Sequence, residues 1–352
     1  MRVDGLFVAG IGTWLPPAVS VQEALADERY DPADQAKNEY VSITVAGDDD
    51  APAEMAVRAA REALVRSGIT AADIALLLHG SLWYQGADFW PAASYIHRNV
   101  LGDEGRHVPA MDVQQMSNGS LAAIELAASY VAAAQHRRAA LITTADRLAQ
   151  PGFDRWRSDL PGIVYGDGAA AVVLARDGFA RLLSVSTVTD SALEGMYRGD
   201  RPFGTVAGHA GYPVDNRVRR AEFAAASDMA ELGRRIRSGL TDAVGQALAE
   251  AEVKAADLRW TVFPNLGVST LRQAYLGPLG LELASTTWEW GRRTGHVGAA
   301  DQLIGLRRIA DSGQAAPGDR VLLVGIGAGF SWTGAVIEFV GQEPGRRSTD
   351  DG

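Results

Sequence analysis

Continuous apolar segments alternate along the chain with segments of helical periodicity, and this alternation constrains the fold more than any other feature. The apolar segments include "IALLLHGSLW" (74–83), "RAALITTA" (138–145) and "GAAAVVLA" (168–175). The segment "PAEMAVRAAREALVRSGI" (52–69) has its apolar residues at helical spacing. A strand that is apolar on both sides needs both faces of its sheet to be covered. The sequence therefore predicts an α/β protein whose sheets lie between layers of helices.

The second half of the chain repeats part of the first. Residues 63–74, "ALVRSGITAADI", align without gaps to residues 247–258, "ALAEAEVKAADL", at an offset of 247 − 63 = 184. Both segments run into an apolar strand. The same offset takes Ser117 to Asp301 (117 + 184 = 301), where a second helix, "DQLIGLRRIADS", is expected to begin. Two like halves predict a pseudo-duplicated protein with a site at the junction.

The repeat divides the chain into four expected parts. Residues 1–177 form the N-terminal half, which contains the helix after Ser117, and residues 236–340 form the C-terminal half. The segment between them, 178–235, is rich in Gly, Pro and Arg, so we expect connecting loops that partly cap the site. The tail 341–352, "GQEPGRRSTDDG", is expected to be disordered.

Composition excludes several classes of function. The chain has 352 residues, 47% of them hydrophobic and 22% charged, which is typical of a globular protein with a sizeable core. A net charge of −10 without a Lys/Arg cluster argues against nucleic-acid binding. No apolar run is long enough for a bilayer and the first residues lack the layout of a signal peptide, so we expect a cytoplasmic protein without a membrane partner. The absence of cysteine excludes disulfides, thiolate metal sites and a cysteine nucleophile, and no metal is expected.

Ser117 lies where a short strand meets an apolar helix in "MDVQQMSNGSLAAIELAASYV" (111–131). A serine at this place is most often an N-cap, although the Glu or Gln of a capping box is missing three residues on. The alternative is a nucleophile at the positive end of a buried helix, with Gly119 allowing another group to approach closely.

A serine nucleophile needs an adjacent base, and the six histidines are the candidates. His296 lies in the glycine-containing loop "RRTGHVGAAD", and Asp301 follows it at the start of a helix, where Asp301 alone would be another N-cap. We hypothesise that Ser117 is the nucleophile, His296 the base and Asp301 the residue that orients His296. His209 in "VAGHAGYP" is the second candidate base. The remaining histidines are expected to be core or surface residues: His79, His97, His107 and His136.

Acyl transfer also needs an oxyanion hole. The backbone N–H of Ser117 and one from "GIGAGFSW" (325–332) are candidates, because glycine admits a ligand close to the backbone. A simple tight turn explains the glycines equally well.

These features together resemble the ketosynthase III branch of the thiolase superfamily over nearly the whole chain. The family's Asp-x-x-x-x-Cys appears as "DVQQMS", which places Ser117 at the cysteine. Its Gly-Asp-Gly-Ala appears as "GDGA" (166–169), and its Phe-Gly-Gly-Gly-x-x-Trp as "IGAGFSW". The resemblance implies a five-layered αβαβα fold, a homodimer, and oxyanion donors from the N–H groups of Ser117 and Ala328, with Gly327 beside them in the pocket.

The departures from the family pattern concern its Cys-His-Asn triad. Asn265 in "VFPNLG" occupies the family's histidine position, and His296 in "GHVGAAD" occupies its asparagine position, with Asp301 added. Asn265 and His296 could still supply, in exchanged places, the two donors that a malonyl-derived enolate needs. Condensation therefore remains open, while acyl transfer through a Ser-His-Asp arrangement is better supported.

Within the family, the chain looks most similar to the serine-bearing ketosynthase III proteins of daunorubicin-type anthracycline pathways. This implies that a short acyl group, propionyl, passes from acyl-CoA to Ser117 and then to acyl carrier protein, with or without condensation with malonyl-carrier protein, to prime type II aromatic polyketide biosynthesis. Acyl-CoA would be a substrate, and no permanently bound cofactor is expected. One alternative is O-acylation of a sugar or other hydroxyl of a natural product, and another is a non-catalytic gatekeeper.

The resemblance also points to a region for CoA binding. The stretch "DRWRSD" lies where the family has an arginine that contacts CoA, and it offers Arg155, Trp156 and Arg157 for phosphate pairing and adenine stacking. The alternative for these residues is a solvated surface loop.

Overall fold

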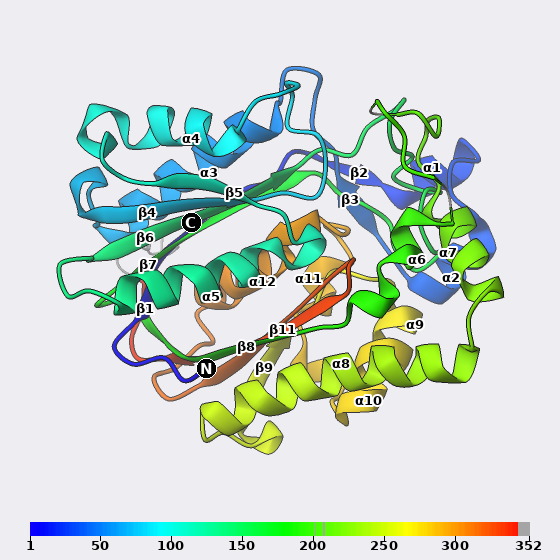
Figure 1. Ribbon diagram of the computed structural model, residues 1–352. Helices are drawn as coiled ribbons and strands as arrows, with labels where there is room; N and C mark the ends of the chain where they lie inside the picture. The colour runs from blue at the N-terminus through cyan, green and yellow to red at the C-terminus, as the bar shows by residue number, and fades with distance from the viewer. Residues whose placement is uncertain (201, 207, 344–352) are drawn as a thin grey trace, which may run out of the picture.

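The computed structural model describes residues 1–200, 202–206 and 208–343. Helices and sheets alternate in five layers (Figure 1). The helices α3 (Pro52–Ser67) and α4 (Ala92–Val100) cover one sheet, α5 (Gly119–Ala132) and α12 (Asp301–Ser312) fill the centre, and α8 (Met229–Glu250) covers the second sheet. The predicted αβαβα arrangement is therefore confirmed.

The strand pairings are nearly symmetric about the centre of the series. Within the described residues, a hydrogen-bonded series runs β5-β4-β6-β7-β1-β8-β11-β10-β9. Its two halves join where β1 and β8 pair, through Phe7–Arg181 and Val8–Ala180 alone. On each side of this seam, two antiparallel neighbours are followed by a parallel pair. The strands of the series are β1 (Phe7–Trp14), β4 (Ile74–Gly80), β5 (Ala110–Val113), β6 (Ala139–Asp146), β7 (Gly168–Ala175), β8 (Ala180–Thr189), β9 (Leu258–Val262), β10 (Arg320–Gly327) and β11 (Ser331–Phe339).

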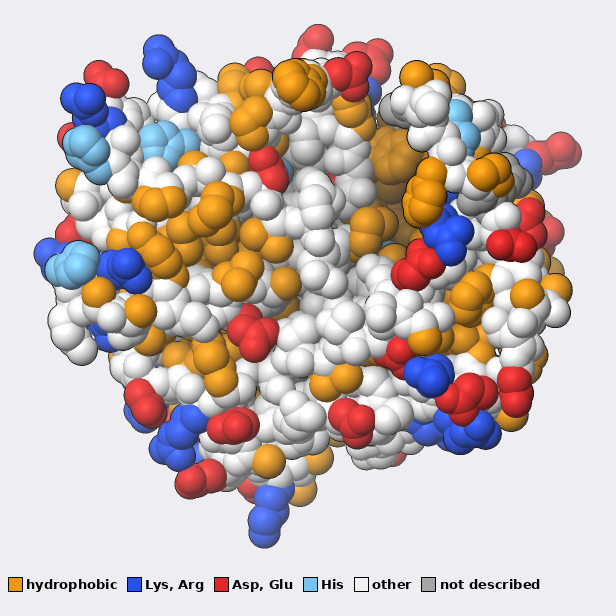
Figure 2. Space-filling view, in the orientation of Figure 1, with side chains coloured by type: hydrophobic (Ala, Val, Ile, Leu, Met, Phe, Trp, Pro, Cys, Tyr) orange, Lys and Arg blue, Asp and Glu red, His pale blue; other side chains and the backbone are white. Residues whose placement is uncertain are grey.

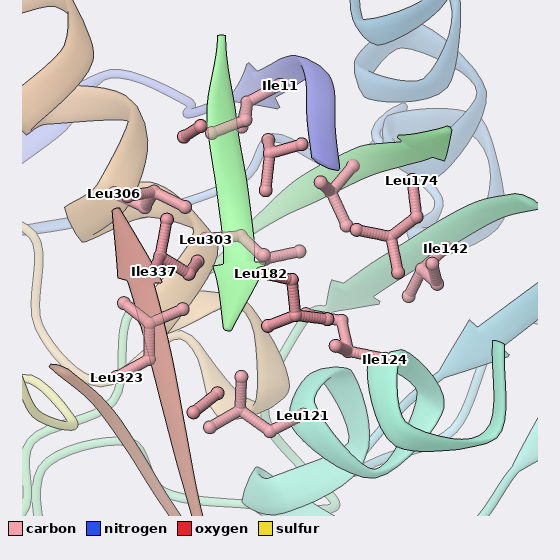
Figure 3. Packing of buried hydrophobic residues seen from close by; sticks show 14 of the residues in the cluster. Ile11, Leu121, Ile124, Ile142, Leu174, Leu182, Leu303, Leu306, Leu323 and Ile337 are labelled. Carbon is pink, nitrogen blue, oxygen red and sulfur yellow. The ribbon is translucent and has the colours of Figure 1, made fainter. Parts of the chain in front are cut away.

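The main core lies between the two sheets. The central helices contribute Leu121 and Ile124 from α5 and Leu303 from α12, and Leu182 and Ile337 reach them from β8 and β11 (Figure 3). All five are at most 2% exposed. Because both central helices have a sheet on each side, α5 is apolar nearly all round, as its sequence indicated. The outer helix α3 begins with Pro52 in its first turn and ends at Gly68 in the left-handed conformation, which are favoured helix start and stop residues.

The predicted repeat is present, but its offset changes along the chain. The short turns before β4 and β9, Ala71–Asp73 and Ala255–Asp257, keep the offset of 184. At the central helices the offset is two residues smaller, since α5 starts at Gly119 and α12 at Asp301 (301 − 119 = 182). The counterpart of Asp301 is therefore Gly119, and the predicted equivalence of Asp301 with Ser117 is wrong by two residues.

The predicted connecting segment, 178–235, contains more regular structure than expected. Strand β8 lies within it, at the seam of the two sheets, as do α6 (Gly195–Arg198), α7 (Asn216–Ala225) and the first turns of α8. The expectation of loops is wrong for β8, because its alternating pattern "ARLLSVSTVT" was read together with the irregular Gly- and Pro-rich residues that follow. The tail 344–352, predicted to be disordered, lies outside the described residues.

Shorter elements complete the described chain. Strands β2 and β3 pair beside the second layer, away from the main series. In the part of the chain that the structure describes, we find no helix with the length and apolar character needed to cross a bilayer. The short elements are β2 (Ala18–Ser20), β3 (Ser42–Thr44), α1 (Val21–Ala26), α2 (Pro32–Asn38), α9 (Val268–Leu271), α10 (Gly277–Leu279) and α11 (Trp288–Gly291).

Candidate active site

Ser117 lies in a tight turn between β5 and α5. The turn is a single 3₁₀ turn, Met116–Asn118, so Asn118 rather than Ser117 is the N-cap of α5, and the N-cap interpretation of Ser117 is wrong. Met116 has φ of 51°, a left-handed conformation that is costly for a residue other than glycine and is often found at functional sites. The side chain of Asn118 donates to Ser331 Oγ (3.1 Å) and Thr333 Oγ1 (2.8 Å) on β11, which fixes the turn.

Ser117, His296 and Asp301 form one continuous chain of hydrogen bonds. Ser117 Oγ is 2.9 Å from His296 Nε2, and His296 Nδ1 is 2.5 Å from Asp301 Oδ2. His296 is 4% exposed and Asp301 is fully buried. The carboxylate accepts a hydrogen bond from the N–H at Nδ1, so the lone pair of Nε2 is available to accept from the serine hydroxyl. The structure thus brings together the three residues that the sequence singled out, in the order that base catalysis requires.

Asp301 accepts further hydrogen bonds from the backbone around it. Its Oδ1 accepts from the N–H of Val297 (2.8 Å), and its Oδ2 accepts from the N–H of Asn265 (2.7 Å). Ala300, not Asp301, is the N-cap residue of α12, so the N-cap interpretation of Asp301 is wrong as well. These donors hold the carboxylate in the orientation that His296 needs.

The loop that carries His296 is anchored at its backbone. The N–H of His296 donates to Val164 O (2.9 Å), and its carbonyl accepts from the N–H of Gly166 (3.0 Å). Gly295 has φ of +76°, and a Cβ there would come within 2.8 Å of the Ile43 side chain, so only glycine fits. The imidazole packs on the ring of Tyr165, with 5.1 Å between centroids. Backbone hydrogen bonds and ring packing therefore fix the position of the base.

Asn265 does not have the role that the sequence predicted. Its side-chain amide donates to Asp301 Oδ1 (3.0 Å) and to Gly295 O (3.0 Å), so both of its N–H bonds are used behind the triad. It does not line the cavity that contains Ser117. The prediction of Asn265 as a pocket donor is wrong, because the buried carboxylate of Asp301 attracts the amide away from the substrate side.

The end of β10 lies directly against the serine turn. Ala328 lines the cavity together with Ser117 and His296, as expected of an oxyanion donor, although its N–H remains a predicted donor. Gly327 does not line the cavity. A Cβ at Gly327 would lie 2.2 Å from Gln115 O, so this glycine allows β10 to approach the turn and does not form a pocket wall.

A cavity of about 340 Å³ opens from the serine. This volume lies in the range of small-molecule sites. Its walls come from both halves and from the cap elements α6 and α7, and Figure 2 shows a hollow with hydrophobic walls on the side where α6 and α7 lie. The walls are rich in aromatic residues: Trp83, Phe153, Tyr165, Tyr197, Tyr275, Phe330 and Trp332.

The three residues predicted to contact CoA have other partners. Arg155 forms a bidentate salt bridge with the buried Asp167, with both hydrogen bonds 2.9 Å long. Trp156 is 7% exposed and packs on Tyr30, and Arg157 donates to the carbonyl of Glu28. None of the three lines the cavity, and Arg155 is committed to Asp167. Contact of Trp156 and Arg157 with CoA stays a prediction. The sequence could not reveal that Asp167, in the "GDGA" motif, is the partner of Arg155.

Asp146, at the end of β6, is a buried acid that sequence reasoning missed. Its Oδ1 accepts from the N–H groups of Leu82 and Trp83 (2.8 Å each), and a Cβ at Gly298 would come within 2.4 Å of its Oδ2. It therefore lies between a cavity wall and the loop that joins His296 to Asp301. Burial raises the pKa of Asp146 to about 7, although the two N–H groups and the nearby His296 lower it.

His296 is the one histidine among the described residues that lines the cavity of Ser117. His209 is exposed and does not line the cavity, so the second candidate base is not supported. His79 is fully buried and bonded to Thr143 and Gln85, as expected of a core residue.

Comparisons with known proteins agree with this architecture. A family model described as 3-oxoacyl-[acyl-carrier-protein (ACP)] synthase III matches residues 111–191, and its C-terminal counterpart matches residues 248–339. A beta-ketoacyl-[acyl-carrier-protein] synthase III of Laribacter hongkongensis is 27% identical over 338 residues, covering 94% of this chain and 98% of its own.

Solved structures extend the comparison. ChlB3, described as an acyltransferase, is 35% identical, with a TM-score of 0.90 over 96% of this chain and 99% of that one. The synthase III FabH of Pseudomonas aeruginosa PAO1 has the same fold, with 20% identity and a TM-score of 0.75 over 96% of this chain and 99% of its own. With two family models in its two halves and a relative above 30% identity along its length, the chain belongs to the 3-oxoacyl-[acyl-carrier-protein] synthase III family of acyl-transferring enzymes.

Proposed function

We propose that the protein is an acyltransferase that works through an acyl-serine intermediate on Ser117. The observation that carries this proposal is the hydrogen-bonded chain from Ser117 through His296 to Asp301, at 2.9 and 2.5 Å, at the wall of a cavity. A serine hydroxyl is a weak nucleophile, and a positioned imidazole is the usual means of activating it.

The first half-reaction forms the acyl-enzyme. Ser117 Oγ bonds to the thioester carbon of acyl-CoA while its proton moves to Nε2 of His296. Asp301 stabilises the imidazolium, and the N–H groups of Ser117 and Ala328 bind the oxyanion. The C–S bond then breaks, and His296 returns the proton to the thiol of CoA. In the second half-reaction an acceptor thiol or hydroxyl attacks the acyl-serine carbon and His296 takes its proton. The ester C–O bond to Ser117 then breaks, and His296 returns the proton to Ser117 Oγ.

Two observations favour transfer over decarboxylative condensation. Both N–H bonds of the Asn265 amide are donated to Asp301 and Gly295, so this side chain has no donor left for a malonyl-derived enolate. ChlB3, which is 35% identical over nearly the whole chain, is described as an acyltransferase. We therefore propose acyl transfer as the main reaction and keep condensation as the less favoured alternative.

The acceptor that we propose is an acyl carrier protein, which the names of the beta-ketoacyl-[acyl-carrier-protein] synthase relatives support. The resemblance to starter-unit proteins of aromatic polyketide pathways adds a propionyl donor and a homodimer as expectations. Transfer to the hydroxyl of a natural product, or a non-catalytic role, are the competing outcomes of the test.

Intact-protein mass spectrometry after incubation with acyl-CoA thioesters tests the proposal. A mass increase equal to one acyl group is expected for the parent protein, mapped to the peptide containing Ser117, and none for Ser117→Ala. Adding carrier protein with its pantetheine thiol should discharge the acyl group onto that thiol. A parent protein that stays unmodified across short, long and aromatic thioesters would contradict the proposal.

A further inference from the structure

Two series of aromatic rings line the cavity, and both begin beside the reacting atoms. In the first, Tyr165 packs on His296 with centroids 5.1 Å apart, Phe153 packs on Tyr165 at 5.0 Å, and Trp83 packs on Phe153 at 5.7 Å. All of these side chains line the cavity. Because the series starts at the base, a group attached to Ser117 contacts it directly.

The second series starts next to the predicted oxyanion donor. Phe330 follows Ala328 by two residues and packs on Trp332 at 5.7 Å and on Tyr197 at 5.8 Å. These rings also line the cavity. Flat ring faces interact best with other planar groups, in stacked or edge-to-face contacts.

Arg220 on the cap helix α7 adds a cationic group to the same cavity. Its Nη1 donates to the hydroxyl of Tyr197 (2.9 Å), and its Cζ lies 5.2 Å from the Tyr197 ring centroid. Within the described ranges, Arg220 makes no ion pair within 4.0 Å. A guanidinium has five N–H donors, so Arg220 retains donors for an oxygen atom in the cavity.

Tyr275 lines the same cavity as Arg220. Burial raises the pKa of Tyr275, and the charge of Arg220 acts in the opposite direction, so the phenol is within the electrostatic reach of Arg220. Arg220 therefore contacts the tyrosine on α6 and acts electrostatically on the one after α9. Asn216 and Arg219 line the same part of the cavity from α7.

We propose that the acyl group carried by Ser117 has an aromatic body, held between the two ring series, and an oxygen substituent that accepts a hydrogen bond from Arg220. This inference rests on the proposed function and names its substrate class. The pantetheine arm departs with the thiol in the first half-reaction, so until the acceptor enters, the acyl group shares the cavity of about 340 Å³ only with water. A propionyl group leaves most of that volume to water, which competes with the acceptor for the acyl-serine.

Acyl-enzyme formation without any acceptor tests the substrate class. Propionyl-, benzoyl- and hydroxybenzoyl-CoA, with the hydroxyl at each ring position, are compared by the rate of the mass increase on Ser117. We expect benzoyl to load faster than propionyl, and at least one hydroxybenzoyl isomer to load about tenfold faster than benzoyl. If propionyl loads fastest, the inference fails and the proposed function stands; if no thioester loads, the proposed function itself fails.

Substitutions on α7 and in the first ring series test the residue assignments. Arg220→Met should abolish the preference for the hydroxybenzoyl isomer over benzoyl, measured as the ratio of the two loading rates, because the hydrogen bond to the substituent is lost. The bond from Arg220 to Tyr197 is lost for both substrates, so it changes the two rates together. Arg217→Met is the matched control, because Arg217 lies on the same helix, pairs with Asp215 and does not line the cavity. Phe153→Leu keeps an apolar side chain but removes a ring, and it should slow benzoyl loading severalfold more than propionyl loading.

Two further outcomes would overturn the inference. One is an unchanged hydroxybenzoyl preference in Arg220→Met. The other is an aromatic preference that is absent in loading and present only when the acyl-enzyme is discharged, which would assign the ring-lined cavity to the acceptor.

Discussion

Asn265 donates to both oxygens of Asp301, with its backbone N–H 2.7 Å from Oδ2 and its side-chain amide 3.0 Å from Oδ1. By the resemblance to the family pattern, position 265 corresponds to the family's histidine; in this chain Asn265 supports the carboxylate that orients His296.

Removing the Asn265 amide should weaken catalysis without weakening binding. Asn265→Ala keeps the backbone donor but loses the bonds to Asp301 Oδ1 and Gly295 O, so we expect kcat to fall about tenfold, with KM nearly unchanged. Asn265→Asp brings a second carboxylate next to Asp301, so kcat should fall further and partly recover as the pH is lowered, because two adjacent carboxylates share a proton. A change confined to KM would contradict this positioning role.

Restoring the family's nucleophile should not restore condensation. Ser117→Cys keeps His296 and Asp301 in place, so we expect it to form an acyl-enzyme and to transfer the acyl group. We expect no β-ketoacyl product with malonyl-carrier protein, because the Asn265 amide is committed to Asp301 and Gly295. Mass analysis of the carrier protein separates the two products, and a condensed product from Ser117→Cys would show that Asn265 reorients during the reaction.

Gly327 should be essential for the position of the serine turn. In Gly327→Ala the new Cβ would lie 2.2 Å from Gln115 O, which forces β10 and the turn apart, so we expect acyl-enzyme formation to slow by at least tenfold. Gly233→Ala on α8 is the control, since a Cβ there meets nothing within 4 Å and alanine is the better helix former by about 1 kcal/mol. Thermal unfolding of both variants shows whether the loss of rate at Gly327 reflects geometry or unfolding. Equal rates in the two variants would contradict the prediction.

Asp146 should make the stability of the protein fall as pH rises towards neutrality. Its pKa is raised from 3.8 to about 7, so between these values the folded protein holds a proton that the unfolded chain releases. The free energy of unfolding should therefore decrease with rising pH in this window, by on the order of a few kcal/mol in all for this group. Denaturant unfolding of Asp146→Asn from pH 5 to 8 should show a shallower decrease than the parent protein. Asp48→Asn is the control, because Asp48 is fully exposed, and an identical slope in parent and Asp146→Asn would refute the prediction.

The exposed edge of the first sheet should form the homodimer that the family resemblance leads us to expect. Strand β5 ends the strand series, and Met111 on it and Leu126 on α5 are 50% and 54% exposed. Figure 2 shows hydrophobic side chains gathered over the region of β5 and α5. Met111→Glu should shift the mass in solution from dimer to monomer, because a carboxylate cannot be buried there without a partner. Light scattering after size exclusion measures this. Val65→Glu, at an exposed position on α3, is the control that should leave the mass unchanged.

The layered fold could be predicted because its signal is local and periodic. The apolar strands and the helix at 301–312 were predicted nearly to their final bounds, since a sheet covered on both faces leaves few polar positions. Strand β8 was missed because its half-buried alternation runs into the irregular segment that follows it. The offset of the repeat was wrong at the central helices because the length of the intervening segment differs between the halves, which no local pattern reveals.

In the candidate site, residue types were enough to identify the catalytic candidates, but the roles of other polar residues depend on tertiary contacts. Ser117, His296 and Asp301 were found because each had a distinctive place beside a glycine or at a helix start. Asn265 and Arg155 were given the wrong roles because an amide or a guanidinium serves a ligand or a buried carboxylate equally well. Only the positions of Asp301 and Asp167 decide between those possibilities, and these positions depend on residues far away in the sequence.

The seam between β1 and β8 has a consequence for how this enzyme can change over generations. The hydroxyl belongs to the repeat on one side of the seam, while the imidazole and its carboxylate belong to the other. Exchange of one repeat between related genes would pair a serine with a partner set shaped for cysteine, or the reverse. Inheritance of the reacting groups is thus tied to inheritance of both repeats as a unit, even though each repeat alone has the outline of the other.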